Sequence, residues 1–373
     1  MDRKPCPKVQ PSKTATILLP GLPTLPENIL ECWVTVSLQI SQPTLWAETG
    51  HEVAWCQSSL SEHKQPSIPA TVQQDLSIQI QETIPSYYVT GSKFSIEFDR
   101  IRGRLAGWTM HGQKLFTTAP TFAAWRTPTE NDTKYDAERW GAYSLDNLQQ
   151  RVISISLQSS DKDSVQITVQ AYIGAVIRDW GFTSTIVYTI YGDGTVVISH
   201  NVRPRGYHPK ILPRLGLDMQ LPSDFASVNW FGCGPEESYA DKRNSQKLGL
   251  HSRTPDNLFT SYEYPQENGN RAGTRWLQLT NSEGVGFVVT RVDDAGTTWG
   301  EFDFAALHYS GKDIAKANHP TELERREDVF LRLDAAHAGL GTARCGPGTL
   351  EKYQVPCKET SFAFSFSPQV PYL

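Results

Sequence analysis

Four clusters of polar residues stand out from the apolar stretches of this chain. The first cluster follows Trp125 and contains Arg126, Glu130, Asn131 and Asp132. A guanidinium group can donate two parallel hydrogen bonds to a carboxylate, so Arg126 could bond Glu130 or Asp132. We take these four side chains as candidate ligand-binding groups. The competing interpretation is a structural turn that is held together by its own ion pair.

The second cluster lies in a glycine-rich stretch, residues 232–241, and contains Glu236, Glu237 and Tyr239. Two neighbouring carboxyl groups could act as a general acid and a general base. Adjacent residues in a chain usually point apart, which weakens that interpretation. Glu237 is nevertheless a catalytic candidate, and Tyr239 is a ligand-binding candidate.

The third cluster contains Gln266, Glu267 and Asn268, and Arg275 follows shortly after. Amides, a carboxylate and the neighbouring tyrosine rings suit a polyol, because a sugar presents both hydrogen-bonding edges and an apolar face. Glu267 is therefore a further catalytic candidate, and the other three are ligand-binding candidates. The alternative is a long turn that is capped by its own side chains.

The fourth cluster begins at His337, which precedes small residues at 338 and 339. A single histidine in such surroundings is more often a satisfied core residue than a base. The catalytic residues therefore stay open, with His337, Glu237 and Glu267 as the candidates. The nine histidines form no H-x-x-x-H or H-E-x-x-H pattern, and neither a phosphate-binding loop nor a dinucleotide-binding fingerprint is present. We expect no metal and no cofactor.

Charge and hydropathy exclude two broad classes of partner. The net charge is −5 and the pI is about 6.0, which argues against the basic surface that nucleic-acid binding requires. The longest apolar run, residues 15–20, is far shorter than the ~20 residues of a membrane-spanning helix. The first residues contain no apolar segment typical of a secretory signal. We therefore expect a cytoplasmic protein that binds neither nucleic acid nor membrane.

The elements that must position these clusters are almost all β-strands. Apolar residues alternate with polar ones, which indicates antiparallel strands with one buried face. Two hairpins are also legible, one turning at residues 192–194 and one at residues 281–284. A short helix is expected over residues 136–143. The expected strands are carried by these apolar sets: Phe94, Ile96 and Phe98; Ile153, Ile155 and Leu157; Val165, Ile167 and Val169; Ile186, Tyr188 and Ile190; Val196 and Ile198; Leu277 and Leu279; Val285, Phe287 and Val289; Phe362, Phe364 and Phe366.

The N-terminal part of the chain has a different character. It is rich in proline, and its two expected strands cover residues 32–40 and 52–60. Prolines at 66, 69 and 85 mark a linker, and the large β region is expected to start near Tyr87. Two or three strands cannot enclose a core of their own. This segment must therefore pack on the larger domain or on a partner, or be incomplete, and we favour an incomplete segment.

Taken together, the clusters resemble one known family. The segments TFAAWRTPTENDT, WFGCGPEESYADK, YPQENGNRAGTRWLQL and HAGLGTARCGP are similar, in this order, to the C-terminal β domain of the glycoside hydrolase family 2 β-galactosidases. That domain also serves as the small chain of two-chain enzymes. CWVTVSLQISQPTLWAETGHEVAWCQ resembles the second half of the immunoglobulin-like domain that precedes it.

The resemblance implies a fold and a division of the chain. The expected fold is all-β, a large antiparallel super-sandwich of the galactose mutarotase-like kind, preceded by a partial immunoglobulin-like segment. The expected domains are residues 1–80, which comprise that segment and the linker, and residues 87–373. Where some members of the family place a tryptophan, this chain reads Thr342-Ala343-Arg344-Cys345-Gly346.

The resemblance also implies an accessory function. A retaining glycosidase needs two carboxylates about 5 Å apart. In the family both sit on a (β/α)₈ barrel of ~250 residues, and no such segment is present in this sequence. The chain is therefore expected to assist carbohydrate hydrolysis beside a large catalytic chain and not to hydrolyse on its own.

Two other interpretations stay open. One is a stand-alone enzyme that catalyses a cofactor-free cyclisation or isomerisation, including pericyclic, Diels–Alder-type chemistry, on a terpenoid or polyketide. It predicts a closed and largely apolar pocket. The other is a carbohydrate-binding or mutarotase-like module, in which His337 would pair with Glu237 or Glu267. It predicts an open groove with a stacked Trp125, Trp140 or Trp276, so the small-molecule ligand is either a sugar or an apolar metabolite.

Overall fold

The computed structural model describes residues 4–18, 21, 24, 29, 31–60, 77–133, 136–159, 163–292 and 299–370. The chain divides into two compact units, Met1–Gln65 and Pro66–Leu373. Most of the linker expected after the first unit lies outside the described residues, including Pro66 and Pro69.

The first unit is built on two antiparallel strands, β1 (Trp33–Gln39) and β2 (Glu52–Ser59). Both strands were expected from the sequence. No side chain in either strand is fully buried, and Leu38 and Val53 are 44% and 54% exposed. A two-stranded sheet without a buried face is only marginally stable in water.

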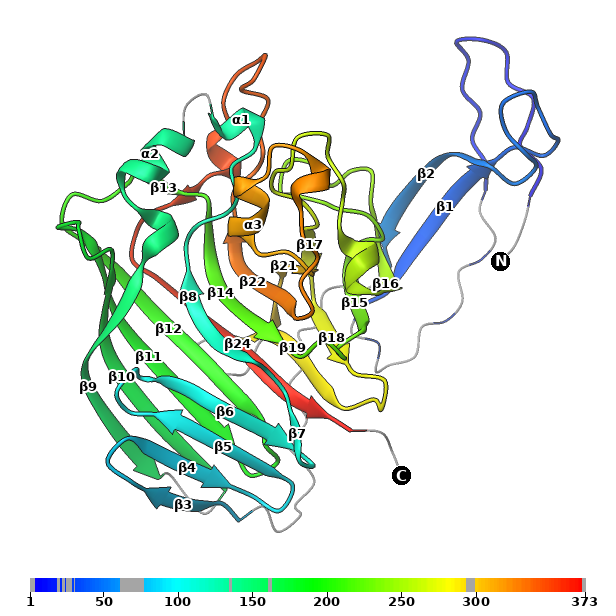
Figure 1. Cartoon of the computed structure of the whole chain (residues 1–373). Coiled ribbons are helices and arrows are strands. Elements are labelled where there is room, and N and C mark those ends of the chain that lie inside the picture. The colour runs from blue at the N-terminus through cyan, green and yellow to red at the C-terminus, as the bar shows by residue number, and fades with distance from the viewer. Residues whose placement is uncertain are drawn as a thin grey trace. The chain divides into compact units, whose positions relative to one another are not determined.

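The second unit contains a 10-stranded antiparallel sheet whose order is β16-β15-β18-β19-β24-β12-β11-β10-β9, with β20 paired to β19 (Figure 1). Both expected hairpins are confirmed, since β11 pairs with β12 and β18 pairs with β19. The bounds of its strands are β9 (Gln149–Ser159), β10 (Ser164–Gly174), β11 (Gly181–Tyr191), β12 (Val196–Arg205), β15 (Ser227–Gly234), β16 (Lys247–Arg253), β18 (Trp276–Thr280), β19 (Gly286–Val292), β20 (Trp299–Gly300) and β24 (Thr360–Gln369).

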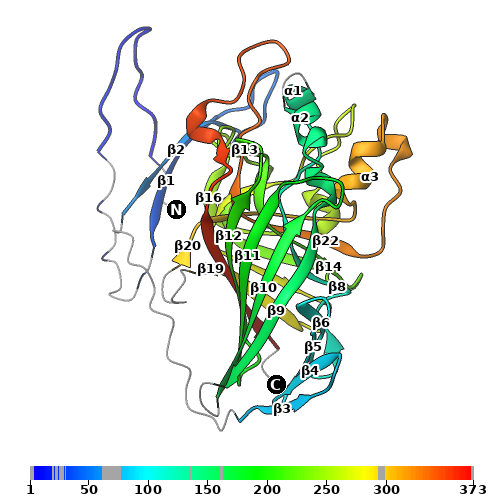
Figure 2. The same ribbon diagram turned by 90° about the vertical axis from the view of Figure 1, so that its left-hand side faces the viewer.

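Two five-stranded antiparallel sheets lie on the same side of this large sheet (Figure 2). We call the one with the order β17-β21-β22-β14-β8 the inner sheet. Its strands are β17 (Arg271–Thr274), β21 (Phe302–Leu307), β22 (Val329–His337), β14 (Arg214–Leu221) and β8 (Thr118–Ala123). The other contains β3 (Gln79–Glu82), β4 (Ser86–Thr90), β5 (Phe94–Asp99), β6 (Arg104–Met110) and β7 (Gln113–Lys114). It therefore begins at Gln79, ahead of the start expected near Tyr87.

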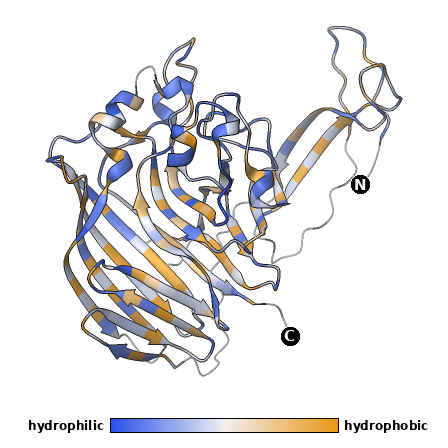
Figure 3. Ribbon diagram, in the orientation of Figure 1, coloured by the Kyte–Doolittle hydropathy of each residue, from blue (hydrophilic) through white to orange (hydrophobic). Residues whose placement is uncertain are grey.

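The core lies between these layers. Phe302 of the inner sheet contacts Phe364 of the large sheet with ring centroids 5.6 Å apart. Trp108 of β6 contacts Phe287 and Phe366 of the large sheet, at 6.3 and 6.5 Å. Apolar and polar residues alternate along the long strands (Figure 3), which is why one face of each strand enters the core. The second unit is thus a large antiparallel β sandwich.

One expected core residue lies outside this core. Ile153 of β9 is 63% exposed, although the alternation predicted that it would share a buried face with Ile155 and Leu157. The pairing of β10 with β9 shifts between Gln170 and Ala171, where Val152 takes the position opposite Ala171. Such a β-bulge reverses the facing of the residues beyond it, so the prediction for Ile153 was wrong.

Helices are short and belong to the connections. The expected helix near residues 136–143 is confirmed as α2 (Ala137–Ala142). In the part of the chain that the structure describes, no helix has the length and apolar character that a membrane span requires. The remaining elements are α1 (Glu130–Thr133), α3 (Gly311–Lys316), the 3₁₀ turns η1 (Leu145–Asn147), η2 (Pro255–Leu258), η3 (Pro320–Glu322) and η4 (Glu351–Tyr353), and the two-stranded pair β13 (Ile211–Leu212) and β23 (Val355–Pro356).

Candidate functional site

The first and fourth polar clusters meet around Arg126. Its guanidinium donates to Oδ1 of Asp132 at 2.8 Å, and both side chains are almost fully buried. It also donates to the carbonyl oxygens of Ala338 at 2.7 Å and Gly339 at 3.3 Å, and lies 3.4 Å from Nδ1 of His337. The expected ion pair therefore forms with Asp132. It fastens the loop after β8 to the end of β22.

Asn131 also connects the loop after β8 to the loop after β22. Its Nδ2 donates to the carbonyl of Gly341 at 2.9 Å, and its Oδ1 accepts the amide of Arg344 at 3.0 Å. Asp241 accepts the amides of Leu340 and Gly341, at 3.0 and 2.8 Å. Since Asn131 uses its amide group to hold backbone, the geometry gives it a structural role in the conformation described. The loop that it holds contains Thr342, Ala343 and Arg344.

Glu237 lies in a network of its own. It accepts hydrogen bonds from Tyr262, from Nζ of Lys242 at 3.2 Å and from the amide of Gly269 at 3.1 Å. Burial acts to raise the pKa of Glu237, but the bond from Tyr262, the amide of Gly269 and the charge of Lys242 outweigh it, and the pKa is lowered from its usual value. A carboxylate held in its charged form by these donors is poorly suited to act as a general acid.

Glu267 and His337 lie side by side in the core. Oε1 of Glu267 is 3.9 Å from Nε2 of His337, and their side chains are 1% and 0% exposed. Both oxygens of Glu267 accept from Arg332, and Tyr239 donates to Oε1 at 3.4 Å. The structure therefore places His337 against Glu267, while Glu237 binds other partners.

The surroundings of His337 determine its protonation state. Burial, followed by the positive charges of Arg126 and Arg332, lowers the pKa of His337 well below its usual value, so the imidazole is neutral. Burial and the charge of Glu267 raise the pKa of Tyr239 well above its usual value. His337, Glu267 and Tyr239 are all buried, so these three side chains contribute rigidity and do not contact the surface in this conformation.

The third cluster mostly caps its own turn. Gln266 accepts the amide of Glu130 at 3.2 Å and donates to the carbonyl of Tyr264. Asn268 accepts the amide of Thr260 at 3.2 Å and donates to the carbonyl of Gln266 at 2.9 Å. Arg275 lies apart from them and forms an ion pair with Glu301 at 3.0 Å. The alternative of a self-capped turn describes Gln266 and Asn268 well.

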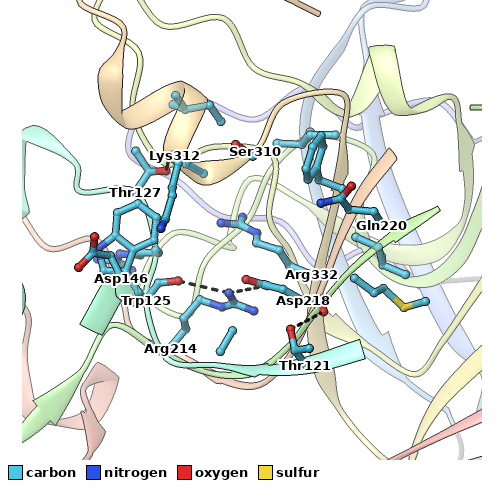
Figure 4. A pocket seen from close by; sticks show the side chains of 18 of the residues that line it. Thr121, Trp125, Thr127, Asp146, Arg214, Asp218, Gln220, Ser310, Lys312 and Arg332 are labelled. Atoms are coloured by element: carbon cyan, nitrogen blue, oxygen red, sulfur yellow. Dashed lines mark hydrogen bonds and ion pairs between the residues drawn. The ribbon is translucent and has the colours of Figure 1, made fainter. Parts of the chain in front are cut away.

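A pocket of about 590 Å³ lies on the face of the inner sheet that points away from the core (Figure 4). Sequence reasoning missed most of it. Asp218 and Gln220 project from β14, and Arg332 projects from β22, directly opposite Asp218. Thr121 of β8 is the other neighbour of Asp218, so Thr121, Asp218 and Arg332 form one row across three strands.

The loops around the inner sheet complete the pocket. Trp125 follows β8, and its carbonyl accepts from Nη1 of Arg214 at 3.2 Å. Thr127 donates to the carbonyl of Gly311 at 2.7 Å, which ties this loop to the start of α3. A Cβ on Gly311 would lie 3.2 Å from the indole ring of Trp125, so the glycine permits a close approach. Of the tryptophans considered from sequence, Trp125 lines the pocket, whereas Trp140 is buried beneath Arg126 and Trp276 belongs to β18.

The described residues contain no group of three or more His, Cys, Asp or Glu side chains arranged to hold a metal ion. Arg214 is fully buried below the pocket and donates to Asp334 at 2.6 Å and to Asp218 at 2.7 Å. The polar side chains on the inner sheet and the ring of Trp125 give the pocket hydrogen-bonding groups and aromatic surface for holding a small ligand.

Comparison with known proteins identifies the family. Residues 90–367 match the family described as "Beta galactosidase small chain", which is well over half of the chain. The chain belongs to the β-galactosidase small-chain family. Residues 2–61 in addition match "Beta-galactosidase, domain 4". The resemblance seen in the four sequence clusters is thereby confirmed.

The related β-galactosidases are considerably longer than this chain. The chain is 29% identical over 324 residues to a β-galactosidase of Kluyveromyces lactis and 28% identical over 312 residues to one of Priestia megaterium. These alignments cover 86% and 83% of this small-chain family member, but only 30% and 28% of the relatives. The chain thus spans about a third of the length of the curated relatives that it matches.

The structure was also compared with solved structures. The matches include a putative aldose 1-epimerase from Escherichia coli and the galactose 1-epimerase from Lactobacillus acidophilus. The TM-scores are 0.39 and 0.40, with 12% and 6% sequence identity. Each covers 79% of this chain, which corresponds to 100% and 98% of the respective epimerase.

Proposed function

We propose that the chain is an accessory β domain of a β-galactosidase that works beside a large catalytic chain and does not hydrolyse β-galactosides alone. One observation carries the proposal: the chain matches the small chain over residues 90–367 and aligns with only 30% of the length of a full β-galactosidase. A cytoplasmic location belongs to the same proposal. The first unit would be a partial immunoglobulin-like segment.

The first unit supports the need for a partner. Its match to domain 4 of β-galactosidases ends at residue 61, and its described strands number two. Leu45 and Trp46, in the turn between the strands, are 108% and 68% exposed. Exposed apolar residues, together with a sheet of only two described strands, favour pairing with further strands. We propose that the large chain supplies the remaining strands of this immunoglobulin-like domain.

Reconstitution tests the accessory function. The Kluyveromyces lactis β-galactosidase, truncated before the region that aligns with this chain, would be mixed with the purified chain, and hydrolysis of a nitrophenyl β-galactoside measured. We expect no hydrolysis by the chain alone and restored hydrolysis in the mixture. The control is the truncated enzyme mixed with its own missing fragment. Restoration by that fragment but not by this chain, or hydrolysis by the chain alone, would contradict the proposal.

The two other interpretations receive less support. A cofactor-free cyclase of terpenoids or polyketides predicts a closed, largely apolar pocket, but the pocket found here carries Asp218, Gln220 and Arg332 on its floor. A mutarotase-like mechanism needs His337 and a glutamate within reach of a ligand, and these side chains are buried. The relatives that the chain matches do not favour either activity.

A further inference from the structure

We propose that a second pocket, at the β9 edge of the large sheet, is a binding site for an organic phosphate, in which a phosphate group is attached to an apolar body. The pocket has a volume of about 660 Å³, which lies within the range of small-molecule sites. It shares no lining residue with the pocket on the inner sheet. The proposal does not rest on the accessory function, because it concerns binding by this chain alone.

Three segments that are distant in sequence bring arginines to this pocket. β9 is the last strand of the large sheet, and its Arg151 is the direct partner of Tyr172 on β10 (Figure 2). The turn between β5 and β6 supplies Arg102, and the turn after β10 supplies Arg178. One strand and two turns thus direct three guanidinium groups to one cavity.

The charges around the pocket favour an anion. Among the described residues, no carboxylate side chain lines it, although the whole chain has a net charge of −5. Arg102 pairs with Asp99 at 2.7 Å, whereas Arg151 lies over the ring of Tyr172 with its Cζ 5.7 Å from the centroid. Neither Arg151 nor Arg178 has a carboxylate partner in the part of the chain that the structure describes. Two guanidinium groups can therefore donate paired hydrogen bonds to phosphate oxygens.

The walls that carry these arginines are held in place by bonds of their own. Nε of Arg178 donates to Oγ of Ser144 at 3.1 Å, which leaves its terminal nitrogens for a ligand. Nε2 of Gln150 donates to the carbonyl oxygens of Arg102 at 2.9 Å and Gly103 at 3.1 Å, which ties the turn to β9. The side chain of Arg178 and the backbone of Arg102 are thus positioned before a ligand binds, and this lowers the entropic cost of binding.

The rim of the pocket is apolar. Ile101 and Val176 both line it, and they are 71% and 78% exposed. Ile101 precedes Arg102 directly, and Val176 lies two positions before Arg178. A free phosphate ion would leave both apolar side chains in water, whereas an apolar group attached to the phosphate could cover them. The combination therefore favours a phosphate monoester.

Calorimetric titration of the purified full chain with phenyl phosphate at low ionic strength tests the proposal. We expect saturable binding with a Kd below about 1 mM. Phenyl sulfate has one charge fewer and inorganic phosphate has no apolar group, so each should bind at least about fivefold more weakly. Arg151→Gln and Arg178→Gln should each weaken the binding of phenyl phosphate roughly tenfold, because each removes charge-assisted hydrogen bonds. The matched control is Arg203→Gln, which should leave the affinity unchanged, because Arg203 is a 56% exposed arginine of the same sheet and lies outside the pocket.

A further variant tests the apolar part of the ligand. Val176→Ser should weaken the binding of phenyl phosphate roughly threefold and leave the affinity for inorganic phosphate unchanged, because only an apolar contact is lost. Equal losses for both ligands would show that the pocket recognises no apolar body and would contradict the proposal.

Four other results would overturn the proposal. The first is the absence of saturable binding of phenyl phosphate, and the second is equal affinity for phenyl sulfate. The third is binding that both Arg151→Gln and Arg178→Gln leave unchanged. The fourth is an equal loss in Arg203→Gln, which would mean a non-specific attraction to exposed arginines. Thermal unfolding of each variant shows whether it folds, and either pocket variant decides if the other does not. These titrations and the reconstitution experiment can fail independently of each other.

Discussion

Asp303 and Asp334 are direct partners across the neighbouring strands β21 and β22. Arg214 donates to Asp334 at 2.6 Å, whereas Asp303 accepts from Nδ2 of Asn270 at 3.0 Å and from the amide of Gly273 at 3.2 Å. Burial, opposed by the bond from Asn270 and reinforced by the charge of Asp334, raises the pKa of Asp303 to about 7. Two carboxyl groups side by side thus have different partners, a cation for one and neutral donors for the other.

The raised pKa makes stability depend on pH. Between the usual value of 3.8 and about 7, the folded state holds a proton on Asp303 that the unfolded state has released. The contribution of this proton to the free energy of unfolding is complete below the usual value of 3.8, and it is lost as the pH rises through about 7. We expect Asp303→Asn to gain stability relative to the parent, by on the order of 1–3 kcal/mol, as the pH rises from about 5 to 8. Urea unfolding at a series of pH values measures the gain, and parallel profiles would refute it.

Loss of the buried ion pair should destabilise the second unit. Arg126→Met removes the cation and leaves Asp132 buried without a counter-charge, which we expect to cost about 3–5 kcal/mol in the free energy of unfolding. Arg102→Met is the matched control, because Arg102 pairs with Asp99 at 2.7 Å but is 66% exposed. It should cost less than about 1 kcal/mol. Chemical denaturation of both variants measures the contrast, and equal losses would show that burial is not the cause.

Two buried histidines should stay neutral near physiological pH. Burial lowers the pKa of His200 to about 3, and its ring stacks on Phe362 with centroids 5.3 Å apart. The pKa of His337 is lowered by burial and by neighbouring arginines. We expect neither imidazole to gain a proton between about pH 8 and pH 5 in a nitrogen-15 NMR titration. Protonation of His337 near neutral pH would restore it as a candidate for acid–base chemistry.

The approach of β14 to β22 depends on a glycine. A Cβ at Gly216 would lie 2.0 Å from the carbonyl oxygen of Leu333, which is backbone and cannot rotate away. We expect Gly216→Ala to destabilise the chain by about 3 kcal/mol or more. Gly107→Ala in β6 provides the comparison, because its nearest neighbour, Cβ of Glu97, is 3.7 Å away. Thermal unfolding should separate the two variants clearly, and similar melting temperatures would mean that β14 can shift to make room.

Much of the sandwich could be predicted from the alternation of apolar residues. The strands around Phe94, Val165 and Phe362 and the hairpin at residues 192–194 follow from a local pattern of period two. The bulge that exposes Ile153 could not be predicted, because a shift in pairing depends on the partner strand. The order of the strands in the sheets could not be predicted either, because it joins strands that are far apart in sequence.

The candidate site shows the same limit. The pairing of Arg126 with Asp132 could be predicted by local reasoning, since the two residues are only six positions apart in the sequence. Asp218 and Arg332 become neighbours only through the pairing of β14 with β22, more than a hundred residues apart. A signal was present, because polar residues occupy alternate positions of both strands. This alternation shows that one face of each strand is polar, but it does not show that loops cover this face and form a pocket.

The two-stranded sheet that the structure describes in the first unit has a consequence for how the protein behaves in a cell. An unpaired strand edge can form hydrogen bonds with any extended chain, including another copy of the same protein. A molecule that found no partner would tend to self-associate or be degraded. If the large chain finishes this sheet, the amount of the small chain that persists is set by the supply of its partner, and the two accumulate in matched numbers.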